Sequence, residues 1–239
     1  MRKTSACLVD VYETLVAYDF EARLRALAAL AGADPLAWQQ DQLQFRTERD
    51  RGLVSTAESF RLSLSACGID PSPQLVSNLT LADRDLMVAN SRPYDDAVPF
   101  LRQLRSNGIK IALVSNCADN TRTLLTDLDL APLADHIILS CEIGFAKPSP
   151  EIYAYALEML GMPPEDAVMV DDLEEYCKGA EAAGVKAIQI TRNGQSADSG
   201  LPAVRSLLDV LGVILCLLYL AALMLKPHAQ LLRAWPERP

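Results

Sequence analysis

The stretch ACLVDVYETLV, residues 6–16, joins an apolar run to a cluster of polar side chains. Its first four residues are apolar, and Asp10, Tyr12, Glu13 and Thr14 follow at once. A continuous apolar run is typical of a strand that is buried on both faces of a parallel sheet. Because burying a carboxylate beside such a strand costs free energy, Asp10 is predicted to have a chemical role.

Similar apolar runs recur along the chain and alternate with helical patterns. The further predicted strands are residues 110–115, 136–140, 167–171 and 186–190. The predicted helices between them include residues 96–108, 150–161 and 173–184. This alternation indicates an α/β fold, a Rossmann-like, doubly wound parallel sheet with right-handed crossovers.

Residues 17–92 break the alternation, because they carry helical periodicity and no strand-like run. An insertion directly after the first strand is expected to lie over the carboxyl ends of the strands, where open α/β sheets bind ligands. The predicted organisation is therefore a core of residues 1–16 and 93–212 and a helical cap of residues 17–92. An apolar C-terminal extension, residues 213–239, follows.

Composition narrows the class of partner. The 239 residues carry a net charge of −9, which argues against nucleic acid as a partner and leaves a small-molecule substrate. The six cysteines include no C-x-x-C pair, which suits a reducing compartment. The N-terminal residues are not typical of a signal peptide, so a cytoplasmic location is expected.

The segment 210–225 contains sixteen residues without a charged side chain. A membrane-spanning helix usually needs about 20 such residues. A buried helix or a contact in a homo-oligomer is therefore favoured. Membrane association through residues 210–225 is the alternative.

Polar side chains capable of catalysis follow several of the predicted strands, and a doubly wound sheet would bring them to one edge. Carboxylates can act as nucleophiles or hold Mg²⁺, and a lysine and a hydroxyl can stabilise developing negative charge. The candidates are Asp10, Thr14, Ser115, Asn116, Lys147, Asp171 and Asp172.

Four segments that contain these candidates resemble the ordered motifs of the haloacid dehalogenase superfamily of hydrolases. They are LVDVYETL (8–15), LVSN (113–116), AKPSPEIY (146–153) and VMVDDLEEYCKGAEAAG (168–184). The resemblance spans roughly residues 6–212, and residues 17–92 occupy the position of a type 1 cap. It implies a hydrolase of this superfamily.

The resemblance also implies roles for single residues. Asp10 is similar to the nucleophile that forms an aspartyl-phosphate or an aspartyl-ester. Thr14 resembles the threonine that supports the loop, and Ser115, with Asn116 beside it, resembles the group that binds the transferring group of the substrate. Lys147 is similar to the lysine that neutralises the nucleophile and the bound anion.

The same resemblance implies a metal site. Asp171 and Asp172 are similar to an acidic motif that coordinates Mg²⁺ together with Asp10 and the backbone carbonyl of Tyr12. Two adjacent aspartates would also repel each other without a cation. Mg²⁺ is therefore the expected cofactor.

Tyr12 and Glu13 depart from the superfamily pattern. Phosphatases of the superfamily typically carry a second aspartate, a general acid, where this chain has Tyr12, and Glu13 replaces the usual glycine. A tyrosine has an unperturbed pKa of about 10 and is a poor proton donor at neutral pH. Tyr12 resembles the metal-free 2-haloacid dehalogenase branch, whereas Asp171 and Asp172 favour a metal.

The predicted function is a Mg²⁺-dependent hydrolase, a phosphatase that acts on a small phosphorylated metabolite through an aspartyl-phosphate at Asp10. A metal-independent 2-haloacid dehalogenase-like hydrolase is the alternative among enzymes. A catalytically weakened binding or assembly protein is a third hypothesis. The cap residues Arg46, Arg49 and Arg51 could contact an anionic substrate, but their alternation with Glu48 and Asp50 favours a solvated face.

Overall fold

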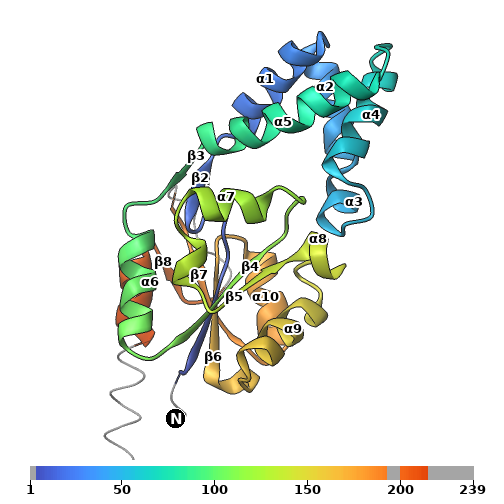
Figure 1. Ribbon diagram of the computed structural model, residues 1–239. Helices are drawn as coiled ribbons and strands as arrows, with labels where there is room; N and C mark the ends of the chain where they lie inside the picture. Colours follow the sequence, from blue (N-terminus) through green and yellow to red (C-terminus); the bar gives the residue numbers. More distant parts are fainter. Residues whose placement is uncertain (1–3, 193–199, 215–239) are drawn as a thin grey trace, which may run out of the picture.

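A computed structural model describes residues 4–192 and 200–214 and contains a six-stranded sheet in the order β5-β4-β1-β6-β7-β8 (Figure 1). All neighbouring strands of this sheet pair in parallel. The strands are β1 (Ala6–Val9), β4 (Lys110–Ser115), β5 (His136–Leu139), β6 (Ala167–Asp171), β7 (Lys186–Ile190) and β8 (Ala203–Val204). The five predicted strands are confirmed. The edge strand β8 was not predicted, because two residues are too few to show a period.

Helices cover both faces of the sheet, as the Rossmann-like prediction requires. Cys7 and Val9 of β1 belong to one hydrophobic core, whereas Ala6 and Leu8 belong to a second core on the opposite face. This division follows from the alternation of side chains along a strand. The helices α6 (Ala97–Ser106), α7 (Thr121–Asp127) and residues 207–214 pack on the first face, and α9 (Pro150–Leu160) and α10 (Glu174–Ala182) pack on the second.

A second, antiparallel pair of strands, β2 (Val16–Tyr18) and β3 (Ser91–Pro93), connects the core to a helical cap. The cap encloses its own hydrophobic core, in which Trp38 and Phe60 stack with ring centroids 5.8 Å apart. Figure 1 shows the cap above the sheet, with β2 and β3 between them. The cap helices are α1 (Phe20–Ala31), α2 (Pro35–Gln44), α3 (Arg46–Asp50), α4 (Thr56–Ala66) and α5 (Pro73–Ala89).

The cap is closed on the core through polar contacts and one close backbone approach. Thr56 Oγ1 donates to Asp119 Oδ1 at 2.5 Å, and Asn120 Nδ2 donates to Asp83 Oδ2 at 2.6 Å. Gly52 has a φ of +67°, and a Cβ on it would lie 2.1 Å from the carbonyl oxygen of Cys141. Glycine is therefore the residue that lets α3 approach α8 (Ser140–Ile143).

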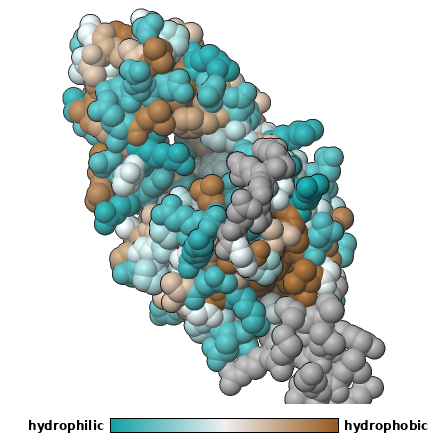
Figure 2. All heavy atoms as spheres, turned by 180° about the vertical axis from the view of Figure 1, so that it is seen from behind, coloured by the Kyte–Doolittle hydropathy of each residue, from teal (hydrophilic) through white to brown (hydrophobic). Residues whose placement is uncertain are grey.

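Hydrophilic side chains cover most of the face shown in Figure 2, and hydrophobic ones appear there as separate small groups. Within the described residues, no helix is long and apolar enough to cross a membrane. Val210, Leu211 and Ile214, at the start of the apolar segment, are buried against the core. The rest of that segment and of the predicted extension, residues 215–239, lies outside the described residues.

Candidate active site

Lys147 lies at the centre of a cluster of carboxylates at the carboxyl ends of β1 and β6. Its Nζ is 2.6 Å from Asp10 Oδ1 and 2.6 Å from Asp171 Oδ2, and its side chain is 0% exposed. Asp10, Asp171 and Asp172 each present an oxygen within 4.8 Å of the others. The two strands are hydrogen-bonded neighbours, which is why residues more than 160 positions apart meet as the sequence predicts.

When all three carboxylates of this cluster are ionised, their negative charge exceeds the positive charge of Lys147. Burial raises the pKa of Asp171 to about 7, although Lys147 opposes the shift. Burial and the carboxylate of Asp10 raise the pKa of Asp172 to about 8. Burial acts to lower the pKa of Lys147, but Asp10 and Asp171 outweigh it and hold that pKa above its ordinary value. One ammonium thus faces three carboxylates, and this set of oxygens fits Mg²⁺.

Lys147 does not directly follow a strand, whereas Asp10 follows β1 and Ser115 and Asp171 end β4 and β6. It lies in the loop between α8 and α9, where Asn116 fixes it: Asn116 Nδ2 donates to the Lys147 carbonyl at 2.8 Å, and Asn116 Oδ1 accepts from the Lys147 N–H at 2.7 Å. A Cβ on Gly179 would lie 2.6 Å from the carbonyl oxygen of Pro148, so α10 also approaches this loop closely. The amide of Asn116 thus positions Lys147, and the predicted role of Asn116 in binding substrate stays a prediction.

Ser115 and Thr14 are both buried. Ser115, at the end of β4, places its Oγ 3.5 Å from the carbonyl oxygen of Asn116. Thr14 Oγ1 has no hydrogen-bond partner among the described residues. The catalytic roles of the two hydroxyls stay predictions.

The loop that carries Asp10 is held by Arg192, which the sequence did not single out, and by Glu13, which was noted only as a departure from the superfamily pattern. Arg192 donates to the carbonyl oxygen of Thr14 from Nη2 at 2.6 Å and from Nε at 3.1 Å. Glu13 adopts a left-handed conformation with φ +58°. Its carboxylate accepts from the backbone N–H of Tyr18 and from the hydroxyl of Tyr94, each at 3.0 Å. Glu13 therefore ties the loop to β2 and to the segment after β3.

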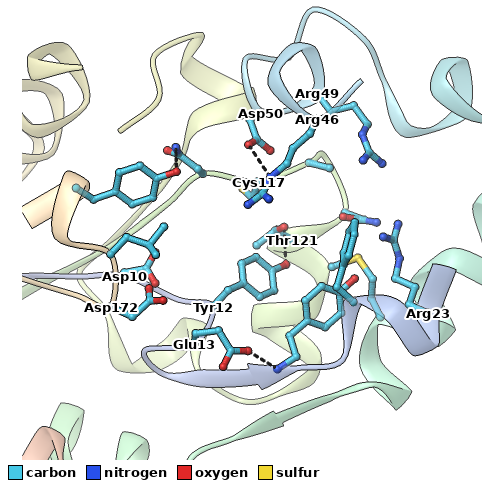
Figure 3. A pocket seen from close by; sticks show the side chains of 18 residues that line it. Asp10, Tyr12, Glu13, Arg23, Arg46, Arg49, Asp50, Cys117, Thr121 and Asp172 are labelled. Atoms are coloured by element: carbon cyan, nitrogen blue, oxygen red, sulfur yellow. Dashed lines mark hydrogen bonds and ion pairs between the residues drawn. The ribbon is translucent and has the colours of Figure 1, made fainter. Parts of the chain in front are cut away.

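A cavity of about 440 Å³ lies between this cluster and the cap. Figure 3 shows Asp10 and Asp172 at one side of it, Arg23 at the opposite side, and Arg46 and Arg49 from the cap. The lining residues are Asp10, Tyr12, Glu13, Tyr18, Phe20, Arg23, Arg46, Arg49, Asp50, Met87, Asn116, Cys117, Ala118, Asn120, Thr121, Asp172, Leu173 and Tyr176.

The solvated face predicted for the cap arginines is wrong for Arg49. Arg49 is 5% exposed and lines the cavity, whereas the side chain of Arg46 is 66% exposed and Arg51 is exposed. Arg23, which also lines the cavity, was not singled out from the sequence. The alternation of charges along α3 gave no sign that Arg49 would pack against Gln42 of α2.

The family model of the haloacid dehalogenase-like hydrolases matches residues 4–184, which include the carboxylate cluster and the cap. The chain belongs to this family. It is 38% identical over 135 residues to a glyceraldehyde 3-phosphate phosphatase of Methanopyrus kandleri, a match that covers 56% of this chain and 58% of that protein. The chain thus spans little more than half the length of this curated relative.

One relative of this haloacid dehalogenase-like hydrolase is named for a different reaction. The chain is 28% identical over 203 residues to (S)-2-haloacid dehalogenase 4A of Burkholderia cepacia, a match that covers 79% of this chain and 84% of that protein. The crystal structure of a HAD phosphatase from Thermococcus onnurineus superposes with a TM-score of 0.65 at 22% identity, covering 88% of this chain and 97% of that one. The structural likeness supports the fold.

Tyr12 of this hydrolase points its hydroxyl away from the carboxylate cluster. The hydroxyl lies 2.9 Å from Thr121 Oγ1, across the cavity from Asp172 (Figure 3). Burial raises the pKa of Tyr12 well above its ordinary value. Tyr12 therefore keeps its proton at neutral pH and is a weak acid for a leaving group.

Tyr176 completes the wall beside Lys147. The Lys147 Nζ lies 4.9 Å from the centroid of the Tyr176 ring, and the Tyr176 hydroxyl accepts from Asn116 Nδ2 at 3.2 Å. A ring face at this distance stabilises an ammonium. The sequence analysis did not assign this role to Tyr176, because the contact depends on how α10 packs on the Lys147 loop.

Proposed function

We propose that this chain is a Mg²⁺-dependent phosphatase that acts on a small phosphorylated metabolite through Asp10. The observation that carries the proposal is the group of three carboxylates around a single buried lysine. Such a group is suited to a divalent cation, because the cation offsets the excess negative charge of the carboxylates and would then attract a phosphate. The phosphatase of M. kandleri supports the same class of reaction.

In this proposal a carboxylate oxygen of Asp10 attacks the phosphorus, the bond between phosphorus and the leaving oxygen breaks, and the leaving oxygen takes a proton from water. Water then attacks the phosphorus of the aspartyl-phosphate, and inorganic phosphate leaves as the Asp10 carboxylate reforms. Lys147 holds Asp10 Oδ1 and so orients the other oxygen for attack. Asp10, Asp171, Asp172 and the carbonyl of Tyr12 would hold Mg²⁺, which supplies positive charge to the phosphate oxygens.

A metal-independent dehalogenase is the second candidate, and Tyr12 is the observation that favours it. A departing halide needs no proton, so the weak acidity of Tyr12 would carry no cost in that reaction. The 28% identity to the B. cepacia dehalogenase is consistent with this alternative. The carboxylate cluster argues against it, because Asp171 and Asp172 would gain nothing from a neutral haloalkyl group.

One screen separates the candidates. The purified protein is assayed for phosphate release from phosphomonoesters and for halide release from 2-haloacids, each with Mg²⁺ and with EDTA. Phosphate release that EDTA abolishes is the expected result. Halide release in EDTA would instead support the dehalogenase, and the absence of both reactions would support a binding protein.

Replacing Tyr12 by aspartate should raise the activity towards phosphomonoesters with poor leaving groups. An aspartate can donate a proton that Tyr12 retains, and general acid catalysis is worth about 10²–10⁴-fold. Activated esters such as p-nitrophenyl phosphate should gain less, and Tyr12→Phe serves as the control that removes only the hydroxyl. Equal kcat/KM values for Tyr12→Asp and Tyr12→Phe on both kinds of ester would contradict this role.

The thermal stability of the metal-free protein should fall as the pH rises from 5 to 8. The pKa values of Asp171 and Asp172, about 7 and about 8, lie above their ordinary value. The folded protein therefore binds more protons than the unfolded chain in this range, and the stability that is present at low pH is lost as the pH rises through these values.

Added Mg²⁺ should reverse this loss, and more strongly at pH 8 than at pH 5, because fewer protons compete for the carboxylates. At about 100 times its Kd, Mg²⁺ would add about 2.7 kcal/mol to the free energy of unfolding. Melting temperatures in EDTA and in Mg²⁺ measure the effect, with Asp172→Asn as the variant that should weaken it. Identical melting temperatures with and without Mg²⁺ at both pH values would exclude a site in this cluster.

A further inference from the structure

The cap side of the cavity presents a buried guanidinium that forms no ion pair with a carboxylate of the described residues. Arg49, on α3, is 5% exposed and lines the cavity together with Arg23. An arginine keeps its charge at all physiological pH values. Burying such a charge without a counterion costs free energy, so the surroundings of each arginine decide whether it is balanced.

Arg23 is balanced within the cap. Its Nη2 and Nε lie 2.5 Å and 2.6 Å from Asp83 Oδ1, and both side chains are almost fully buried. Asp83 also accepts from Asn120 Nδ2 through Oδ2. Within the described residues Asp83 forms neither a hydrogen bond nor an ion pair with Arg49, so its charge acts on Arg49 from a longer distance.

Arg49 is not balanced. Its Nη1 and Nη2 donate to the side chain and the carbonyl of Gln42, each at a long 3.3 Å. In residues 4–192 and 200–214, its Nε is buried without a hydrogen-bond partner, and no carboxylate forms an ion pair with Arg49. Burial and the charge of Arg23 lower the pKa of Arg49, and Asp83 and Asp50 oppose this shift without cancelling it. The net downward shift reflects the cost of holding the charge there. An anion in the cavity would remove that cost.

Asn120 makes the same region of the cavity receptive to a polar ligand. Because its Nδ2 must donate to Asp83, its Oδ1 is the atom left over, and that oxygen is buried without a hydrogen-bond partner among the described residues. Arg49 and Asn120 thus supply an unused donor and an unused acceptor in one cavity. Buried polar groups are normally satisfied, so the unused pair points to a ligand rather than to packing.

The other end of the cavity holds Asp10, the proposed nucleophile, and Asp172, which would help to hold the cation. An anionic group bound at Arg49 would then belong to the same ligand as the phosphate and lie at the opposite end of that ligand. The volume of about 440 Å³ is near the lower limit for small-molecule sites. Such a volume favours a compact metabolite and disfavours a nucleotide.

We propose that Arg49 binds a carboxylate of the substrate, so that the chain selects small phosphomonoesters that carry a carboxylate at the end remote from the phosphate. This inference rests on the proposed phosphatase function. The carboxylate accepts charge-assisted hydrogen bonds from the guanidinium of Arg49, which has an unused Nε. Arg49 is then a specificity residue and takes no part in the transfer of the phosphoryl group.

The test compares two phosphomonoesters that share a three-carbon skeleton. 3-Phosphoglycerate carries a carboxylate where glycerol 3-phosphate carries a hydroxymethyl group, and the wild type should hydrolyse the acid with the higher kcat/KM. Arg49→Met should reduce the ratio of the two kcat/KM values by about 10- to 100-fold, because a hydrogen bond to a charged group is lost. The loss should lie mainly in KM, since the carboxylate is bound equally in the ground and transition states.

Arg46→Met is the matched control, because it removes the same charge from the same cavity wall. The side chain of Arg46 is 66% exposed, and its Nε lies 4.0 Å from Asp50 Oδ2. The ratio of the two kcat/KM values should therefore change much less in Arg46→Met than in Arg49→Met. Arg49→Lys, which keeps the charge, should recover part of the ratio. Arg49→Met should melt no lower than the wild type, since it removes an uncompensated buried charge.

The outcomes separate this inference from the function on which it rests. If the wild type with Mg²⁺ cleaves p-nitrophenyl phosphate but treats the two three-carbon esters alike, the carboxylate site is wrong and the phosphatase stands. If it releases phosphate from none of the three esters, the phosphatase itself is wrong. If Arg49→Met lost kcat/KM equally for both three-carbon esters and also melted at a lower temperature, the role of Arg49 would be structural and the inference would be overturned.

Discussion

Asp10→Asn should reduce phosphate release by about 10⁴-fold or more, which is the order of loss when a nucleophile is removed. The substitution keeps the shape of the side chain but replaces an oxygen that can attack phosphorus by an amide that cannot. The fold should persist, because Lys147 retains its contact of 2.6 Å with Asp171. Removing one of three crowded carboxylates should also reduce the repulsion among them.

The measurement is kcat with saturating Mg²⁺, and circular dichroism establishes that the variant is folded. Asp95→Asn is the matched control, because it makes the same chemical change at an exposed position of the core. It should retain activity within a small factor. Residual activity of Asp10→Asn above a few parts in a thousand, in a preparation free of host phosphatase, would contradict nucleophilic attack by Asp10.

Lys147→Met should be the most destabilising single substitution in the site. It leaves Asp10 and Asp171 facing each other without the ammonium that now lies 2.6 Å from both. Removing one partner of a buried ion pair typically costs about 3–5 kcal/mol of unfolding free energy. Activity should also fall, because neither Asp10 nor the bound phosphate would have its counter-charge.

The destabilisation of Lys147→Met should depend on pH in a definite direction. Without Lys147, which now opposes the upward shift of the pKa of Asp171, that pKa should rise further. The penalty is therefore greatest near pH 8 and smaller near pH 5, where protons replace the missing cation.

Urea denaturation at both pH values measures this difference. Lys178→Met is the control, because Lys178 is exposed and pairs only with Glu174 on the same helix. An exposed pair of this kind is worth at most about 1 kcal/mol. If the two lysine variants lost equal stability, the carboxylate cluster would not be the source of the effect.

Much of the fold could be predicted from the sequence because the strands of the sheet are buried on both faces. Burial on both faces makes a strand such as β4 or β6 a continuous apolar run, which stands out against amphipathic helices. The short ribbon β2–β3 and the strand β8 carry no such signal, since two or three residues cannot display a period. The extended conformation of β2, β3 and β8 depends on the strands with which they pair.

The carboxylate cluster was also predictable, with one limitation. Asp10 and Asp171 lie beside adjacent parallel strands, and topology alone brings such residues to one edge. Lys147 reaches the cluster from a loop that Asn116 clamps at 2.7 Å and 2.8 Å. The sequence indicated the residue, but only the packing of that loop gives its nitrogen equal access to two carboxylates.

The environment of the cap side chains was decided by the tertiary structure alone. A charged residue on a short amphipathic helix such as α3 is typical of a solvated face, and Arg46 conforms to this expectation while Arg49 does not. Arg49 lies among other cap helices, where it donates to Gln42 of α2 and lies near Arg23 of α1. Local periodicity reports which residues share a face of a helix. It cannot report which distant surface will cover that face, because burial belongs to the pair of surfaces.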